Sequence, residues 1–90
     1  MYKLTSTLSF EEDVRRLDRP VAKRILDKLE HLANNPSLAK PVQYLPKDLQ
    51  GLQKYRVGDW RVFFWLNHKA KEIVLYGVKH RSLVYNRFRS

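Results

Sequence analysis

The sequence contains no cysteine, only three glycines and four prolines, and half as many acidic as basic side chains. Without cysteine there is no disulfide framework, no thiolate metal site and no cysteine nucleophile. The few glycines and prolines argue against a disordered tail. The longest strongly apolar stretch, residues 62–66, is too short to cross a bilayer, and residues 1–20 lack the continuous apolar segment of a secretion signal. We therefore expect an intracellular, cytoplasmic protein that makes no use of a membrane.

A chain of 90 residues has room for one hydrophobic core, so residues 1–90 are predicted to form a single domain. The 18 basic and nine acidic residues give a formal charge of +9. This charge is uneven, because residues 1–53 carry nine basic and seven acidic side chains whereas residues 54–90 carry nine and two. A polyanion is the expected partner, and the second part of the chain is expected to bind it.

The first half of the chain has the pattern of one strand followed by two helices. Residues 2–6 alternate loosely and are rich in strand formers. Ser9 and Glu12 have the spacing of a capping box, which predicts a short helix with Ser9 as its N-cap. Asp18 and a proline two residues later predict the start of a second helix, which should end near Asn34. The proline-rich stretch up to residue 51 is expected to be a loop that contains at most a short helical turn.

From residue 54 onward the apolar period changes to two. Residues 54–57, 60–67 and 72–80 read as three strands, joined by Gly58-Asp59 and by residues 68–71. The predicted fold is therefore α+β, in the order β-α-α-β-β-β, with a twisted, mainly antiparallel sheet and both helices on one face. A short terminal helix is predicted over residues 84–88.

The two-residue Gly58-Asp59 connection fixes the register of the first hairpin. It places Arg56 opposite Arg61, with Lys54 two residues away on the same face. Opposed like charges destabilise a sheet by up to about 1 kcal/mol, so this arrangement suits either an anion-binding site or a solvated basic face. The opposite face receives the apolar side chains that the helices need, namely Tyr55, Val57, Val62, Phe64 and Leu66.

The last strand is expected to continue this pattern. If residues 68–71 form a four-residue loop, Asn67 faces Glu72, and the side chains of Val74, Tyr76, Val78 and His80 share the face of Arg61. His80 would then lie near the basic cluster. Phe63, Trp65 and Tyr76 would lie on the same face, where they would either stack on bases or pack beneath the terminal segment or an antitoxin helix.

The available side chains exclude two common hydrolytic mechanisms. Asp59 and Glu72 are the only acids after residue 53 and the histidines are far apart in sequence, so no metal site is predicted. No nucleophile elbow or glycine-rich oxyanion loop is visible. Cleavage of RNA by its own 2′-hydroxyl remains, because the protein then needs only to position the chain and stabilise phosphoryl charge. The guanidinium groups of Arg56 and Arg61 are suited to stabilising the phosphoryl charge. Tyr85 or His80 is suited to transferring the proton.

Two segments carry a family resemblance. Residues 52–64 (LQKYRVGDWRVFF) and residues 78–85 (VKHRSLVY) are similar to the hairpin and the C-terminal ending of the RelE/ParE superfamily of toxins, and in particular of its RelE-like branch. The resemblance implies a ribosome-dependent endoribonuclease that cuts messenger RNA in the decoding site, needs no cofactor and is silenced by a cognate antitoxin. That antitoxin is expected to present acidic and apolar residues.

The resemblance also assigns roles to individual residues. Arg61 corresponds to the phosphate-stabilising arginine, and Tyr85 to the C-terminal tyrosine proposed as general base. Lys54 and Arg56 correspond to the basic pair of the preceding strand. Arg81 is the candidate for the second functional arginine, and Lys79 is an alternative that would bind phosphate. His80 is a candidate for proton transfer. ParE-like members share the fold but act on DNA gyrase, so gyrase inhibition is the main alternative, followed by RNA binding without catalysis.

Overall fold

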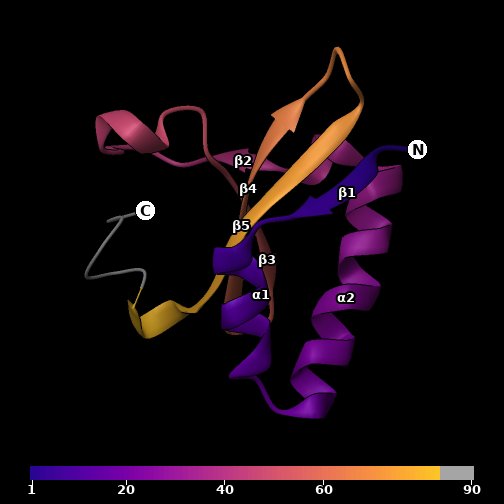
Figure 1. Ribbon diagram of the computed structural model, residues 1–90, viewed down its shortest axis with the longest axis vertical. Helices are drawn as coiled ribbons and strands as arrows, with labels where there is room; N and C mark the ends of the chain where they lie inside the picture. The colour runs from indigo at the N-terminus through magenta and orange to yellow at the C-terminus, as the bar shows by residue number, and fades with distance from the viewer. Residues whose placement is uncertain (84–90) are drawn as a thin grey trace.

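The computed structural model describes residues 1–83 (Figure 1). The elements follow in the order β1 (Lys3–Ser6), α1 (Leu8–Arg15), α2 (Arg19–Asn34), the 3-10 helix η1 (Pro36–Leu38), β2 (Lys40–Pro41), the 3-10 helix η2 (Lys47–Leu49), β3 (Gln53–Val57), β4 (Trp60–Asn67) and β5 (Glu72–His80). Residues 81–83 are helical. The predicted α+β class and the order of its main elements are confirmed, whereas the helix predicted over residues 84–88 lies outside the described residues.

The sheet has five strands in the order β1-β5-β4-β3-β2. Strand β1 runs parallel to β5, and the other neighbours are antiparallel. Sequence reasoning missed the edge strand β2, which has only two residues and pairs Lys40 with Lys54 and Pro41 with Gln53. A two-residue strand has no visible period, and a proline is tolerated in a sheet at just such an edge.

Helix α1 begins two residues earlier than predicted. Its N-cap is Thr7, whose Oγ1 accepts a hydrogen bond from the backbone N–H of Phe10 at 3.2 Å, while Ser9 lies inside the helix. The sheet imposes this choice, because the backbone N–H and the hydroxyl of Thr7 both donate to the Leu75 carbonyl of β5. The chain therefore turns into the helix directly at the end of the parallel strand pair.

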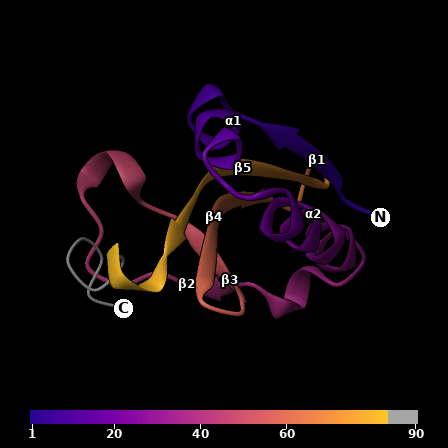
Figure 2. The ribbon, with the colours of Figure 1, turned by 90° about the horizontal axis from the view of Figure 1, so that it is seen from below.

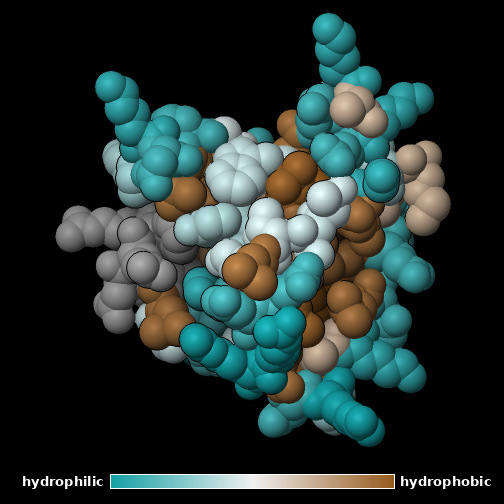
Figure 3. Space-filling view, in the orientation of Figure 1, coloured by the Kyte–Doolittle hydropathy of each residue, from teal (hydrophilic) through white to brown (hydrophobic). Residues whose placement is uncertain are grey.

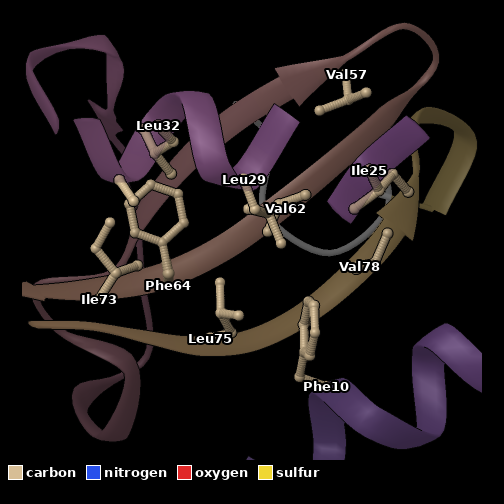
Figure 4. Close-up of a cluster of buried hydrophobic side chains, with 11 residues drawn as sticks. Phe10, Ile25, Leu29, Leu32, Val57, Val62, Phe64, Ile73, Leu75 and Val78 are labelled. Atoms are coloured by element: carbon tan, nitrogen blue, oxygen red, sulfur yellow. The ribbon is translucent and has the colours of Figure 1, made fainter. Parts of the chain in front are cut away.

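Both helices pack against one face of the sheet, as predicted, and build the main core there (Figures 1 and 2). Figure 4 shows how aromatic and branched side chains from α1, α2, β3, β4 and β5 converge in this layer. The buried members are Phe10, Ile25, Leu29, Leu32, Ala33, Val57, Val62, Phe64, Ile73, Leu75 and Val78. Four of these residues, Ile25, Leu29, Leu32 and Ala33, come from α2, and this layer fixes the strands on which the site is built.

The loop between β2 and β3 covers part of the opposite face (Figure 2). A smaller cluster of Val42, Leu52 and Phe63 is buried there, with Leu45, Leu49, Trp65 and Tyr76 packed around it. Phe63 has no exposed surface. Phe63 therefore packs, but beneath the β2–β3 loop rather than beneath the terminal segment or an antitoxin helix, and the prediction that Phe63 stacks on bases is wrong.

A β-bulge changes the register of β5 against β4. Phe63 faces Gly77 but Phe64 faces Leu75, so Tyr76 is an extra residue on β5. Before the bulge the predicted pairing of Asn67 with Glu72 is confirmed. Beyond it the alternation is reversed, because an inserted residue moves every later side chain to the other face.

Candidate nucleic-acid interface

Four cations from three strands line one pocket at the edge of the sheet. Lys40 of β2, Lys54 and Arg56 of β3 and Arg61 of β4 surround a pocket of about 360 Å³, together with Leu38 and Tyr55. We call these four side chains the cation cluster. The paired strands hold their backbones in place, because Lys40 faces Lys54 and Arg56 faces Arg61 in the ladders. The predicted opposition of the two arginines is confirmed.

The two guanidinium groups converge on a single backbone atom at the hairpin turn. Nε of Arg56 donates to the Gly58 carbonyl oxygen at 3.3 Å, and Nη1 of Arg61 donates to the same oxygen at 3.2 Å. Gly58 adopts a φ of +61°, the left-handed conformation that a two-residue hairpin turn favours at its first central residue. Nη1 of Arg61 also donates to the Trp60 carbonyl at 3.2 Å. Neutral carbonyls thus orient the two positive groups, and the N–H donors of Nη2 of both arginines and of Nη1 of Arg56 remain for a ligand.

A third arginine, which sequence reasoning did not single out, reaches the same turn from helix α2. A Cβ atom built on Gly58 would lie only 2.8 Å from Nη2 of Arg24. Glycine is favoured at this turn by its left-handed backbone conformation, whereas the Arg24 guanidinium is the end of a flexible side chain that can move aside for a Cβ atom. No pattern in the sequence links residue 24 to residue 58, since the proximity arises from the packing of α2 on the sheet.

The cation cluster has no carboxylate partner among residues 1–83. The ion pairs in this part of the chain join Lys79 to Asp13 and Arg81 to Asp59. Burial, followed by the nearby positive charges of Arg61 and Lys40, lowers the pKa of Lys54. A neighbouring anion would act in the opposite direction, because it favours the charged form. The local electrostatics therefore favour binding of a negatively charged ligand at this pocket.

Lys79 lies beside this cluster but is already paired. It faces Arg61 across the β4–β5 ladder, yet its Nζ lies 3.1 Å from a carboxylate oxygen of Asp13 in α1. Asp13 also accepts the backbone N–H of Val78 at 2.9 Å. Sequence reasoning missed Asp13, although an acid three residues after Phe10 falls on the apolar side of α1 and could have signalled a buried partner.

His80 does not lie where the sequence predicted. Beyond the bulge it is Lys79, and not His80, that shares the face of Arg61, and Val78 and His80 lie on the helix face. The His80 ring packs edge-on against Trp60 with centroids 5.1 Å apart, and its Nδ1 lies 3.0 Å from the Ser82 hydroxyl. The prediction failed because the alternation was extended through the extra residue Tyr76.

The other predicted residues lie at or beyond the end of β5. The backbone N–H of Arg81 donates to the Asp59 carbonyl at 2.8 Å, which ties the end of β5 to the β3–β4 turn. Its guanidinium lies 3.9 Å from the Asp59 carboxylate, and both side chains are largely exposed. Arg81 thus shares the end of the sheet that carries Arg56 and Arg61. Tyr85 lies outside the described residues.

Residues 1–83 hold neither a cluster of metal ligands nor a membrane-spanning helix. They contain no group of three or more histidine or acidic side chains placed to hold a metal ion. None of the helices described by the structure has the length and apolarity needed to span a bilayer.

Comparison with solved structures finds the same fold in several toxins. A chain of the RelBE2 toxin–antitoxin complex of Mycobacterium tuberculosis is 22% identical, with a TM-score of 0.77 over 90% of this chain and 92% of that chain. The isolated RelE toxin of Escherichia coli is 18% identical, with a TM-score of 0.72 over 96% and 93% of the two chains. A YoeB/ParE toxin of Agrobacterium tumefaciens is 20% identical, with a TM-score of 0.64 over 87% and 96%.

Comparison of the sequence with known families gives a match over nearly the whole chain. Residues 4–85 match the model of the ParE toxin of type II toxin–antitoxin systems. A search of curated proteins found no match. With the fold of the RelE and ParE toxins and a family match of this extent, the chain belongs to the ParE toxin family of type II toxin–antitoxin systems, within the RelE/ParE superfamily.

Proposed function

We propose that this toxin is a ribosome-dependent endoribonuclease that cleaves messenger RNA in the cytoplasm. The observation that carries the proposal is the convergence of the Arg56 and Arg61 guanidinium groups on one carbonyl oxygen, beside two lysines and without a carboxylate among residues 1–83. Preorganised cations are what phosphodiester cleavage requires from a protein when the nucleophile belongs to the RNA. Such a site stabilises negative charge without reorganising during the reaction.

The proposed reaction begins with the RNA held across the cation cluster. The 2′-oxygen of one nucleotide attacks the adjacent phosphorus, its proton passes to a base, and the bond from phosphorus to the 5′-oxygen of the next nucleotide breaks. The products are a 2′,3′-cyclic phosphate and a 5′-hydroxyl, because the leaving oxygen takes up a proton from water. Arg61, with Arg56 and Lys54, binds the non-bridging oxygens as their charge increases. We assign the general base to Tyr85, because His80 lies on the other face of the sheet from Arg61, and we assign to Arg81 a second contact with the phosphate.

The partners in this proposal follow from charge and exposed apolar surface. Phosphate contacts from the cation cluster would attach the toxin to ribosomal RNA in a salt-dependent manner. The solved relatives include toxin–antitoxin complexes from bacteria and archaea. Leu8, Leu26 and Leu83 are 67%, 48% and 53% exposed, and Figure 3 shows apolar surface between projecting hydrophilic side chains. A cognate antitoxin with apolar and acidic residues would match this surface.

Brief induction followed by primer extension on translated messages tests the nuclease. Cuts are expected only on messages engaged by ribosomes, and Arg61→Ala should abolish them while the variant remains folded and binds its antitoxin. Arg19→Ala is the matched control, because it removes the same charge from the exposed start of α2. Full cleavage by Arg61→Ala would contradict the proposed role of the cluster.

Inhibition of DNA gyrase is the second candidate, and the family match to the ParE toxin favours it. Under this alternative the messages remain intact after induction, and gyrase-trapped DNA breaks accumulate. The cation cluster would then contact gyrase or DNA. The same induced cells can be assayed for both lesions, so one experiment separates the two candidates.

A further inference from the structure

The amine of Lys54 has surroundings that no other lysine shares. All lysines of the chain lie within residues 1–83, and only Lys54 and Lys79 are partly buried. Lys79 forms an ion pair with Asp13, whereas no ion pair or hydrogen bond holds the Lys54 Nζ in this part of the chain. Burial, followed by the positive charges of Arg61 and Lys40, lowers the pKa of Lys54. Such a lysine is a better nucleophile than an exposed one, because a larger fraction of it carries the free electron pair.

Two arginines lie beside this amine on the same face of the sheet. Arg56 is two residues from Lys54 along β3, and Arg61 is its diagonal neighbour on β4. Strand residues two apart are separated by about 6.4–6.8 Å, and diagonal Cβ atoms by about 7–8 Å or less. Long side chains bridge both distances, and all three residues line one pocket. A group bound by the two guanidiniums is therefore within reach of the Lys54 Nζ.

The arginines suit a phosphoryl group as the bound part of a ligand. A guanidinium offers paired N–H donors that match phosphate oxygens, and it stays protonated at any physiological pH. Backbone carbonyls at the hairpin turn hold both guanidiniums in place. Arg56 and Arg61 together neutralise a phosphoryl dianion, so this dianion raises the pKa of Lys54 less than an isolated anion would. The amine therefore keeps its reactivity when such a ligand binds.

The remaining space of the pocket suits a small organic group. Its volume of about 360 Å³ is at the lower end of the range for ligand pockets. Leu38, which is 40% exposed, contributes an apolar wall. A phosphate that carries a short acyl chain fits both features, because its charged end matches the arginines and its hydrocarbon end matches the leucine. The acyl carbon of such a ligand is joined to the phosphorus by one oxygen, which brings this electrophile to the Lys54 amine.

We propose that Lys54 is a covalent modification site for small acyl phosphates, with Arg56 and Arg61 binding the phosphoryl group of the donor. The neutral Nζ attacks the acyl carbon and forms a C–N bond. The bond from the acyl carbon to the bridging oxygen then breaks, and its electron pair leaves with inorganic phosphate. The nitrogen passes one proton to the departing phosphate or to water, and an amide remains. No atom is oxidised or reduced, and no further reactant is needed.

Acylation would remove one positive charge from the cation cluster. The amide cannot ionise, and the added acyl chain occupies part of the space in which a phosphate binds. Both changes weaken the attraction for a polyanion. Modification would therefore lower the activity of the toxin when acyl phosphates are abundant. This consequence rests on the proposed nuclease, whereas the reaction of Lys54 with an acyl phosphate does not.

The reaction is tested on the full-length toxin with acetyl phosphate as the donor. Mass spectrometry of peptides gives the acetylation rate at each lysine. Lys54 is expected to react at least about tenfold faster than the exposed Lys23 of α2, which is a small part of what positioning can contribute. Equal rates at Lys54 and Lys23 would overturn the proposal.

Acetic anhydride separates binding of the phosphoryl group from the reactivity of the amine itself. This donor is uncharged, so the arginines cannot position it, and the excess of the Lys54 rate over the Lys23 rate should be much smaller than with acetyl phosphate. Added inorganic phosphate should slow the acetyl phosphate reaction at Lys54 and leave the reaction at Lys23 unchanged. The same preference for Lys54 with both donors would refute the phosphoryl site.

Variants identify the groups that hold the donor. Arg61→Ala and Arg56→Gln should each lower the ratio of the acetyl phosphate rate to the anhydride rate at Lys54, because each removes donors to the phosphoryl group. This ratio cancels any change in the reactivity of the amine itself. Arg19→Ala, which removes a charge from the exposed start of α2, should leave the ratio unchanged. Arg56 is exposed, so Arg56→Gln decides the test if Arg61→Ala does not fold, and an unchanged ratio in it would contradict the assignment.

The modification and the nuclease fail separately. Lys54→Gln, which resembles the acetylated side chain, should cut messages less than Lys54→Arg, which keeps the charge, and equal cutting would refute the effect on activity. If Lys54 is acetylated selectively but the wild type leaves messages intact, the modification site stands and the nuclease proposal fails. If messages are cut but Lys54 reacts no faster than Lys23, the modification site fails and the nuclease remains.

Discussion

Arg61 and Lys79 are neighbours on the same face of the sheet, yet the fold places them in opposite electrostatic settings. They face each other across the β4–β5 ladder. Lys79 is paired with Asp13, whereas Arg61 points at a neutral carbonyl and stands beside three further cations. A cation paired with a partly buried carboxylate stabilises the fold, while cations grouped without one raise the free energy of the folded state until an anion binds. On one surface, Lys79 is therefore an ion-paired cation, and Arg61 is a cation without a carboxylate partner among residues 1–83.

The largest expected difference between the two residues is in RNA cleavage. Arg61→Ala should lower the cleavage rate by about 10²–10³, the usual cost of removing one preorganised donor to a developing negative charge. Quantitative primer extension on a ribosome-engaged message measures this rate. Lys79→Met keeps most of the length of the side chain, and it should lower the rate far less. Equal losses in the two variants would remove the distinction between paired and unpaired cations.

For the stability of the fold, the order of the two sites should be reversed. Loss of Asp13, the partner of Lys79, should destabilise the fold more than loss of a charge from the cation cluster. Asp13→Ala leaves the Lys79 ammonium and the Val78 N–H without their acceptor, which should lower the free energy of unfolding by about 1–3 kcal/mol. Urea unfolding followed by circular dichroism measures the change. Arg56→Gln, which removes a charge from an exposed position of the cluster, should leave the stability unchanged or raise it by up to about 1 kcal/mol. A larger loss in Arg56→Gln than in Asp13→Ala would contradict the comparison.

The pH dependence of the free energy of unfolding tests how the grouped cations affect Lys54. Because the pKa of Lys54 is lowered in the folded protein, the unfolded chain binds more protons between that pKa and the ordinary value of 10.5. The contribution of Lys54 to the free energy of unfolding should therefore rise with pH through this window. Lys54→Met should flatten that rise, and sulfate should reduce it by raising the pKa of Lys54 in the folded state. Thermal melts between pH 7 and 10, with and without sulfate, measure this effect. The quantity compared is the difference between the wild type and Lys54→Met at each pH.

The smallest effect is expected at the exposed pair of Arg81 and Asp59. Its charged groups are 3.9 Å apart with side chains 58% and 65% exposed, so Asp59→Asn should change the free energy of unfolding by about 0–1 kcal/mol. The same urea titration measures it, with Asp13→Ala as the reference. A loss as large as that of Asp13→Ala would show that the end of β5 depends on this ion pair.

Much of the fold was predictable because the apolar period and the turn chemistry act locally. The Gly58-Asp59 turn sets the β3–β4 register, and this was enough to bring Arg56 and Arg61 together. The position of His80 was not predictable, because a bulge in a fully apolar stretch leaves no mark on the alternation. Arg24 and Asp13 were missed for a different reason, since their contacts depend on how the helices pack on the sheet. The roles assigned to Tyr85 and His80 stay predictions.

The bulge at Tyr76 also affects how distant relatives should be aligned. A relative without the extra residue would present its later β5 side chains on the reverse side at the same count from the loop. Matching positions by number alone would then equate a side chain on the face of the cation cluster with one that points into the core. An alignment of such toxins is more reliable when the two halves of β5 are aligned separately. The first half is aligned from the loop before the strand, and the second half from the hairpin turn that the end of the strand contacts.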